Sequence, residues 1–590
     1  MIKDKTRPTA AGSGSIQRKL VTPLMVLWAM MVLLALSFVP AEATTTFIVN
    51  ETGDDADADI TDDRCDSDSA ATGRQCTLRA AIEESNDTAG ADIIDFDLGG
   101  TGAQAISPTS ELPTITDTLT IDGYTQAGAS ENTLEEGNDA VLNVALGGLS
   151  AGAGADGLEI AAPDCTIKGL VIRNFEGSGI LITGSGATGN RIEGNFIGVN
   201  RDGITDKGNL AGVYIDGTSN TVGGTQPEVR NVISGNEDGV FVAGTGATGN
   251  RIEGNLIGTT ADGTAALGNS IHGIYLSGAD NTIGGTTAGA RNVISGNGGD
   301  GIRMSFDATE NRVEGNFIGT TADGNGDLGN ASNGTYIAGA DNNTVGGTAA
   351  GAGNVISSND GDGVLMFGTG ATDNRVEGNI LGTTANGTAA LGNTESGVDI
   401  SGDASNNTVG GTLPGAANRI ARNGEDGVQV LGPNASNRIL SNRIYRNSGL
   451  GIDLVGGTED SDGVSANDPG DTDTGSNDLQ NFPVIRSATR STATGETTIS
   501  GRLNSTPSQD FTVQCFLTGG PPASGYGEGS RLLDTTTVST SASGGARFSC
   551  TSSSPLLGQI PGQTVSTTAT NEATSDTSEF SRNRAITTGP

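Results

Sequence analysis

The stretch GNRIEGNLIGTTADGTAALGN (249–269) decides the fold, because it recurs along the chain with few changes. Its other copies are GNRIEGNFIGVNRDGITDKGN (189–209), ENRVEGNFIGTTADGNGDLGN (310–330) and DNRVEGNILGTTANGTAALGN (373–393). A second kind of unit lies between the copies, such as NTIGGTTAGARNVISGNGGDGIRM (281–304). The two kinds together make a two-coil repeat of about 60 residues, and a fixed period of this kind is typical of a solenoid.

One Asn and one Gly return in every unit. The Asn positions lie 30 to 33 residues apart, at Asn190, Asn220, Asn250, Asn281, Asn311, Asn343, Asn374, Asn407 and Asn437. The Gly positions mark ten units, at Gly179, Gly212, Gly239, Gly273, Gly301, Gly334, Gly363, Gly397, Gly427 and Gly451. We expect the Asn amides to stack along one corner with hydrogen bonds from coil to coil. The Gly is expected to supply positive φ at another corner.

Short runs within each unit have the period of a strand. After the Gly, apolar residues alternate with outward positions, as in Val240/Val242 and Ile274/Leu276. This spacing indicates strands with one buried face, whereas Gly and Asn at every corner are poor helix formers. The sequence therefore predicts an all-β solenoid of about ten coils, closed at both ends by caps.

The N-terminal cap is expected to contain a short helix. QCTLRAAIEESN (75–86) can form it, with Leu78 and Ile82 on one face. The first strands are then expected to begin in ELPTITDTLTIDGYTQ (111–126).

Two segments resemble known families. TFIVNETGDD (46–55), followed by RCDSDSAATGRQCTLRAAIEESN (64–86), is similar to a CSLREA domain, with CTLRAAI in the place of the family's motif. The coils after it resemble the right-handed parallel β-helix repeats of the pectate-lyase-like superfamily. Together the resemblances cover about residues 46–455. They imply the fold and export, and leave the activity open.

The ends of the chain differ in composition from the repeat. A basic start, an uncharged stretch at 20–40 and Ala41-Glu42-Ala43 predict a signal peptide, with an uncleaved membrane anchor as the alternative. After 483, about seven short strands separated by turn residues predict an immunoglobulin-like β-sandwich, and the last of these strands is expected at SEFSR (578–582). The expected organisation is: signal peptide 1–43, CSLREA-like cap 44–100, parallel β-helix 101–455, acidic linker 456–482 and β-sandwich 483–590.

The net charge and the cysteines limit the possible partners and the cellular compartment of the protein. The formal net charge of −38 argues against a nucleic-acid partner and suits a secreted or cell-surface protein, without a membrane span once the signal is removed. Export permits disulfides, and the positions in the chain favour Cys65–Cys76 and Cys515–Cys550, with Cys165 as a buried thiol.

An aromatic column is the candidate binding face. The outward residue after the corner Gly is aromatic at Tyr214, Phe241, Tyr275 and Tyr336. Rings at strand spacing beside acids and amides fit the binding of extracellular polysaccharide, although the same rings could simply stack on one another. We therefore expect a carbohydrate-binding β-helix, with a purely structural adhesin or surface rod as one alternative.

A polysaccharide lyase or a related carbohydrate-active enzyme is the other alternative, and no catalytic residue is assigned. Such an enzyme needs a base, for which His272, Arg303 or Tyr275 are candidates, and Asp238 or Asp300 could hold a metal ion. No cofactor is required by the sequence. Ca²⁺ binding is a hypothesis for the acidic stretch with Asp460, Asp462, Asp468, Asp471 and Asp473, and a solvated linker is its alternative.

Overall fold

The computed structural model describes residues 44–68, 73–433, 436–518, 524–553 and 562–589. The predicted signal peptide lies outside these ranges. Among the helices of the described ranges, none is both long and apolar enough to cross a membrane.

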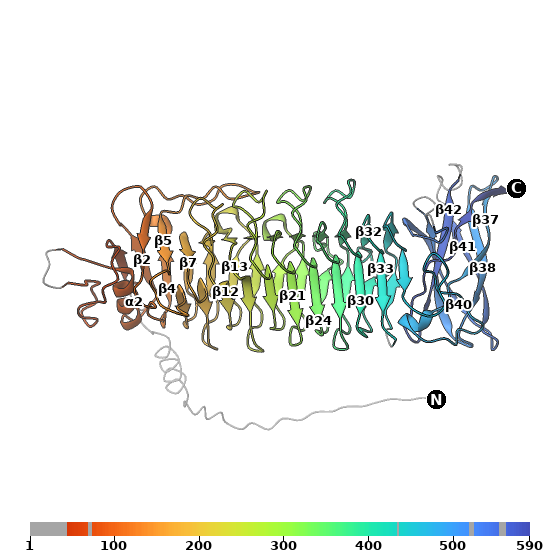
Figure 1. Cartoon of the computed structure of the whole chain (residues 1–590), viewed down its shortest axis with the longest axis horizontal. Helices are drawn as coiled ribbons and strands as arrows, with labels where there is room; N and C mark the ends of the chain where they lie inside the picture. Colours follow the sequence, from red (N-terminus) through yellow and green to blue (C-terminus); the bar gives the residue numbers. More distant parts are fainter. Residues whose placement is uncertain (1–43, 69–72, 434–435, 519–523, 554–561, 590) are drawn as a thin grey trace, which may run out of the picture. The chain divides into compact units, whose positions relative to one another are not determined.

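Three long parallel sheets form the first part of the fold (Figure 1). Each full coil gives one short strand to each sheet, as with β16, β17 and β18, so the chain is a parallel β-helix, as predicted. Sheet A has 13 strands: β1 (Thr46–Val49), β2 (Asp92–Phe96), β4 (Leu119–Asp122), β7 (Thr166–Lys168), β10 (Arg191–Glu193), β13 (Thr221–Gly223), β16 (Arg251–Glu253), β19 (Thr282–Gly284), β22 (Arg312–Glu314), β25 (Thr344–Gly346), β28 (Arg375–Glu377), β31 (Thr408–Gly410) and β34 (Arg438–Leu440).

Sheet B has 12 strands: β3 (Gln104–Ile106), β5 (Val144–Gly147), β8 (Leu170–Arg173), β11 (Phe196–Ile197), β14 (Val232–Ile233), β17 (Leu256–Ile257), β20 (Val293–Ile294), β23 (Phe317–Ile318), β26 (Val355–Ile356), β29 (Ile380–Leu381), β32 (Arg419–Ala421) and β35 (Arg443–Tyr445). Sheet C has 11 strands: β6 (Leu158–Ile160), β9 (Ile180–Ile182), β12 (Ala211–Ile215), β15 (Asp238–Val242), β18 (Ile274–Leu276), β21 (Ile302–Ser305), β24 (Thr335–Ala338), β27 (Val364–Phe367), β30 (Val398–Ser401), β33 (Val428–Leu431) and β36 (Ile452–Leu454). The ten predicted units are the last ten strands of sheet C, and β6 adds one more coil before them.

The predicted Asn ladder is present, and two more accompany it. In the predicted ladder, the backbone N–H of Asn250 donates to Oδ1 of Asn281 (2.9 Å), and Asn281 repeats the contact with Asn311. A second ladder precedes the strands of sheet B: Asn195, Asn231, Asn255, Asn292, Asn316, Asn354, Asn379, Asn418 and Asn442. A third precedes sheet C: Asn209, Asn236, Asn269, Asn297, Asn330, Asn359, Asn393, Asn423 and Asn447. Each corner therefore satisfies its backbone polar groups with amides.

The corner Gly residues have a different role from the one predicted. Gly212, Gly239 and Gly273 are not among the positive-φ residues, so conformational freedom is not the reason for glycine there. A Cβ on Gly273 would lie 2.6 Å from the carbonyl oxygen of Gly301 and 2.6 Å from Cγ2 of Ile294. The coils approach so closely at this corner that no side chain fits.

The N-terminal cap begins the stack earlier than the sequence suggested. β1 pairs in parallel with β2, which pairs with β4, so the first strand is residues 46–49 and not part of 111–126. The predicted helix is present as α2 (Leu78–Asp87), with Leu78 and Ile82 buried on one face. The disulfide Cys65–Cys76 joins the preceding loop to its start, and Cys165 is a buried free thiol.

A β-sandwich follows the last coil. Sheet D has the order β41 (Gly545–Ser552), β38 (Thr497–Asn504), β37 (Val484–Ser491) and β44 (Thr587–Gly589). Sheet E has the order β40 (Arg531–Ser539), β39 (Asp510–Leu517), β42 (Thr564–Asn571) and β43 (Arg584–Ala585). The predicted disulfide Cys515–Cys550 joins the two sheets. Short 3₁₀ turns lie at η1 (Gly123–Thr125), η2 (Pro227–Val229), η3 (Ala288–Ala290) and η4 (Ser476–Leu479).

Six of the seven predicted strands of the sandwich are confirmed, and the prediction for 578–582 is wrong. That segment is not a strand but packs on the last coil of the β-helix, where Phe580 contacts the position of Gly451. Glu579 accepts the backbone N–H groups of Leu454 (3.2 Å) and Ser465 (3.1 Å). The sandwich side therefore supplies the C-terminal cap of the stack.

Candidate functional site

The predicted aromatic column runs along the outward face of sheet C. The strand register places Tyr214 beside Phe241, and Phe241 beside Tyr275. Arg303 follows Tyr275, and Tyr336 follows Arg303. All five side chains are half-buried because they point outward between neighbours on adjacent coils. The structure thus brings the predicted binding residues into one continuous row.

The rings of this row stack on one another. The ring centroids of Tyr214 and Phe241 are 5.2 Å apart with planes at 4°, and those of Phe241 and Tyr275 are 4.6 Å apart at 14°. Both faces of the Phe241 ring are therefore covered by its neighbours. A ligand could therefore contact only the ring edges and the hydroxyl groups of Tyr214 and Tyr336. Neither hydroxyl has a hydrogen-bond partner among the described residues.

Arg303 interrupts the aromatic row. Its guanidinium carbon lies 4.6 Å from the centroid of the Tyr336 ring, a cation–π contact. Its Nη1 lies 3.3 Å from a carboxylate oxygen of Asp300, whose side chain is almost fully buried. The side chain of Arg303 is itself 33% exposed, so it offers the row a positively charged donor.

Asp238, His272 and Asp300 belong to a fourth ladder, which was not predicted from the sequence. Each side chain accepts the backbone N–H of the equivalent residue on the next coil, as His272 does for Asp300 (3.2 Å). The ladder continues without a break through Asp238, His272, Asp300, Asn333, Asp362, Ser396 and Asp426 to the N–H of Leu450. These side chains therefore link the N-terminal ends of successive strands of sheet C. A column of residues able to accept hydrogen bonds, directly before the Gly, was the available signal.

The hydrogen bond at His272 fixes its tautomer. Because a backbone N–H can only donate, Nδ1 of His272 must accept, and the ring proton of the neutral form lies on Nε2. Burial lowers the pKa of His272, although Asp300 and Asp238 oppose that effect. Burial also raises the pKa of Asp238. In this arrangement no ring nitrogen of His272 is free to take a proton from a substrate.

The second half of the same face is acidic, and none of its residues was selected from the sequence. Asp399 lies beside Gln429, which lies beside Asp453, in the register that continues the aromatic row. Burial raises the pKa of Asp399 to about 6 and that of Asp453 to about 7. Burial and then Asp399 raise the pKa of Asp362, in the adjacent ladder, to about 8.

The predicted calcium residues separate into two turns. Carboxylate oxygens of Asp468, Asp471 and Asp473 all lie within 4.8 Å of one another. Asp460 and Asp462 are not part of that group, and Asp460 accepts the N–H of Asp462 in a turn of its own. Burial raises the pKa of Asp471 to about 6. Oδ1 of Asp473 is buried without a hydrogen-bond partner among the described residues. Three carboxylates of this kind match the oxygen ligands that Ca²⁺ prefers.

Sheets A, B and C with their side-chain ladders define a parallel β-helix protein. No family model matches the chain, so the resemblance to a CSLREA domain stays a prediction, and no curated protein matches either. Among solved structures, the chain is similar to tailspike protein 2 of the Escherichia coli O157:H7 bacteriophage CAB120, with 13% identity and a TM-score of 0.30 over 91% of this chain and 64% of that one. The periplasmic alginate epimerase AlgG gives 13% identity and a TM-score of 0.23, over 60% of this chain and 63% of that one. This chain thus spans less than two thirds of either neighbour, and such low scores indicate nothing about activity.

Proposed function

We propose that this protein is an exported β-helix that binds extracellular polysaccharide along the outward face of sheet C. The observation that supports this best is the row from Tyr214 to Asp453, in which adjacent coils present one side chain each. Strands repeat about every 4.8 Å, so the row offers regularly spaced groups along a line, as an extended polymer would require. The two disulfides favour an oxidising compartment and so support export.

The proposed contacts are hydrogen bonds and ring edges rather than stacking on ring faces. Phe241 is covered on both sides, so a sugar ring cannot lie flat on it. The hydroxyl groups of Tyr214 and Tyr336 and the guanidinium of Arg303 are the polar groups that sugar hydroxyls or carboxylates would meet. Gln429 and the carboxyls of Asp399 and Asp453 extend the same line.

Binding is favoured over a lyase reaction. A lyase base must accept a proton, but His272 already uses Nδ1 as an acceptor within the ladder. Asp238 and Asp300 also accept backbone N–H groups, from His272 (3.1 Å) and Asn333 (3.1 Å). Their hydrogen bonds explain their positions without a catalytic role. A structural adhesin without a glycan ligand remains an outcome of the test.

The test uses the mature chain on immobilised neutral and acidic polysaccharides. Combined Tyr214→Ala, Tyr275→Ala and Tyr336→Ala substitutions are expected to abolish binding, whereas Tyr445→Ala, in sheet B, leaves it unchanged. Arg303→Gln keeps the ring stack and serves as a second variant if the triple variant unfolds. Unchanged binding by both would refute the proposal, and no glycan binding by the wild type would favour an adhesin. New ultraviolet absorbance from uronate polymers, with or without Ca²⁺, would favour the lyase instead.

We also propose that Asp468, Asp471 and Asp473 bind Ca²⁺. The close approach of the three carboxylates supports this, because without a cation their charges repel one another. Asp471 is further tied to Asn481 and Gln480, so a bound ion would fix the segment that joins the β-helix to the sandwich.

A further inference from the structure

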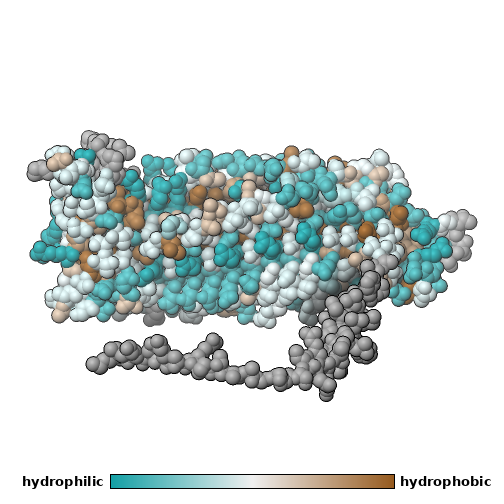
Figure 2. Space-filling view, turned by 180° about the vertical axis from the view of Figure 1, so that it is seen from behind, coloured by the Kyte–Doolittle hydropathy of each residue, from teal (hydrophilic) through white to brown (hydrophobic). Residues whose placement is uncertain are grey.

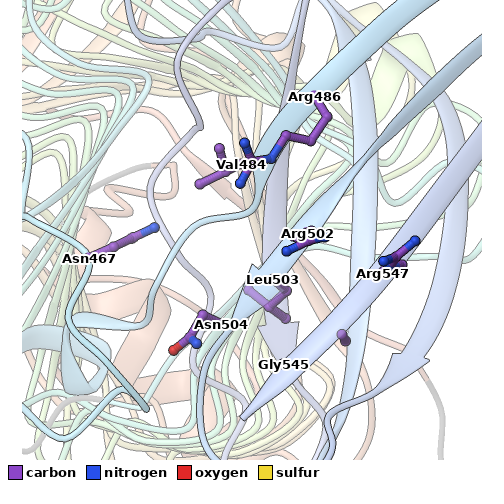
Figure 3. Close-up of a pocket in the computed structure, with 9 residues that line it drawn as sticks. Asn467, Val484, Arg486, Arg502, Leu503, Asn504, Gly545 and Arg547 are labelled. Carbon is purple, nitrogen blue, oxygen red and sulfur yellow. The ribbon is translucent and has the colours of Figure 1, made fainter. Parts of the chain in front are cut away.

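A hollow on sheet D gathers arginine side chains. It has a volume of about 460 Å³ and is lined by nine residues, among them Arg486, Arg502 and Arg547 (Figure 3). The three arginines come from three neighbouring strands, β37, β38 and β41. Asn467 and Asn504 add amide groups to the lining. No lining residue is acidic, although the chain has 69 Asp and Glu against 31 Lys and Arg.

The three guanidinium groups have no counter-charge within the described part of the chain. The side chains of Arg486, Arg502 and Arg547 make no ion pair and no hydrogen bond with any described residue. By contrast, Arg191, Arg251, Arg312 and Arg375 on sheet A each pair with the glutamate two residues later. The hollow is therefore a concentration of uncompensated positive charge on an otherwise acidic protein.

The arrangement brings like charges close together, and a bound anion would offset their repulsion. Arg502 and Arg547 lie directly opposite each other in the antiparallel register, and like charges in that position repel. Arg486 lies at the register shift between Ile485 and Ser487, where a bulge redirects the side chain of the extra residue. The bulge leaves Arg486 exposed beside the hollow instead of paired across to β38.

We propose that this hollow binds a carboxylate-bearing segment of an acidic polysaccharide. Adjacent strands are about 4.8 Å apart, which is close to the length of one sugar unit, so neighbouring uronate carboxylates can each meet one guanidinium. Arginine is well suited to this because its planar fork matches a carboxylate with two parallel hydrogen bonds. Nδ2 of Asn504 donates to no described residue, while its Oδ1 accepts the N–H of Gly470 (2.8 Å), so this amide can donate to a sugar hydroxyl.

The small size of the basic surface favours an acidic polysaccharide over a nucleic acid as the ligand. A nucleic acid carries its phosphates over many turns and needs a long basic surface, whereas this basic surface is confined to three residues on a chain of net charge −38. A polyuronate can place a few carboxylates in the hollow and continue into solvent. The site is separate from the face of sheet C and does not depend on binding there.

The test measures binding of oligogalacturonate by the full mature chain, with a neutral glucan of equal length and dextran sulfate as comparisons. Arg502→Gln is expected to weaken binding about tenfold, which corresponds to about 1.4 kcal/mol. The triple variant with Arg486→Gln and Arg547→Gln should abolish it. Arg251→Gln removes the same charge elsewhere and should leave binding unchanged. Rising salt should weaken the wild-type interaction, because exposed charges are screened.

Each outcome decides the proposal. Failure of the wild type to bind oligogalacturonate, or equal binding by the triple arginine variant, would overturn it. Binding of dextran sulfate alone would overturn the assignment to carboxylates. If the tyrosine variants of sheet C lose neutral-glycan binding while oligogalacturonate still binds, the two sites are distinct. Melting temperatures of the arginine variants serve as the folding control, and removal of the Arg502–Arg547 repulsion should leave them unchanged or higher.

Discussion

Close approach of main chains sets the identity of the corner residue on sheet C. At Gly273, Gly239 and Gly212 the carbonyl oxygen of the next corner Gly occupies the space of a Cβ, together with an Ile methyl group from sheet B. Neither obstacle can move easily, because one is backbone and the other lies in the packed core. A methyl group at any of these positions would have to separate two coils.

A substitution at Gly273 tests this requirement. Gly273→Ala is expected to destabilise the protein by about 2 kcal/mol, because overpacking of a close contact forces a backbone shift. Gly246→Ala is the matched control, since nothing lies within 4 Å of a Cβ there. Chemical denaturation followed by circular dichroism measures both. Equal midpoints for the two variants would show that the corner tolerates a side chain.

Sequence alone could predict the ladder residues but not all of their reasons. The Asn190–Asn437 column was identified from its period, and the columns through Asn195 and Asn209 have the same period in the same copies. An alignment on one Asn per unit does not show that these columns form ladders of their own. The predicted role of the corner Gly was wrong because a close approach of main chains and a positive φ both require glycine, so the sequence alone cannot separate the two reasons. The spacing of the aromatic column allowed the rings to stack on one another, but whether they do so depends on side-chain angles, which no residue pattern contains.

The elements of the sandwich pack against the last coil of the β-helix and support it. Its side chains accept backbone N–H groups of the last coil: Thr577 accepts the N–H of Ile439 (2.9 Å), and Glu528 accepts that of Asn447 (3.0 Å), the last residue of the third Asn ladder. Phe516 and Phe580 meet edge to face, with centroids 5.4 Å apart, and join the core of the β-helix. An open end would expose a row of unpaired backbone groups, so this contact protects the stack from aggregation.

Loss of Phe580 should weaken this cap. Phe580 is 3% exposed, and Phe580→Ala is expected to cost about 3 kcal/mol by leaving a cavity between the last coil and sheet E. Phe306→Ala, where the side chain is 77% exposed, is the control and should change stability little. Limited proteolysis and light scattering on heating would detect a loosened cap. Identical protease resistance of the two variants would contradict the role of Phe580.

Calcium should stabilise the segment between the two parts. Chelation is expected to lower the melting temperature, with a loss of about 1 kcal/mol for a weak extracellular site held above its dissociation constant. Asp468→Asn with Asp473→Asn should remove the response to calcium. Asp460→Asn with Asp462→Asn should keep it, because those residues lie in another turn. A melting temperature that is insensitive to calcium in the wild type would exclude the site.

The strands of sheet C and of the sandwich show which elements a local sequence pattern can predict. Alternation predicted the strands of sheet C, and turn residues delimited six strands of the sandwich, because both signals are local. Residues 578–582 alternate in the same way but pack on Gly451 and Leu454, more than 100 residues earlier. The early strand β1 was missed for a similar reason, since its partner β2 lies across the whole cap. Long-range contacts of this kind are not encoded in local periodicity.

At the scale of the whole molecule, several carboxyls are buried beside an apolar core. On the face seen in Figure 2, hydrophobic residues are scattered among hydrophilic ones rather than gathered into one continuous patch. The same chain buries carboxyls in its ladders and cap. Burial raises the pKa of Glu579 to about 9 and that of Glu84, whose two oxygens have no hydrogen-bond partner among the described residues, to about 7. The formal net charge of −38 counts these carboxyls as ionised, whereas burial in the folded protein favours their protonated form.

Stability of the whole chain should consequently fall as the pH rises. Carboxyls whose pKa in the folded state is raised, to about 6 for Asp399, about 8 for Asp362 and about 9 for Glu579, bind more protons when folded than when unfolded. Their contribution is fully present at low pH and is lost as the pH rises from about 4 through these values. We expect a higher melting temperature at pH 5 than at pH 8, with on the order of 1 kcal/mol for each such group.

Calorimetry at both pH values measures this difference, and two isosteric variants assign it. Asp362→Asn keeps an acceptor for the N–H of Ser396 but cannot ionise, so it should be more stable than the wild type at pH 8 and similar at pH 5. Asp139→Asn is the control, because hydrogen bonds from Thr133 lower the pKa of that exposed carboxyl and it stays ionised at both values. A wild type equally stable at both pH values, or an Asp362→Asn variant with an unchanged pH dependence, would show that the ladder carboxyls do not control stability.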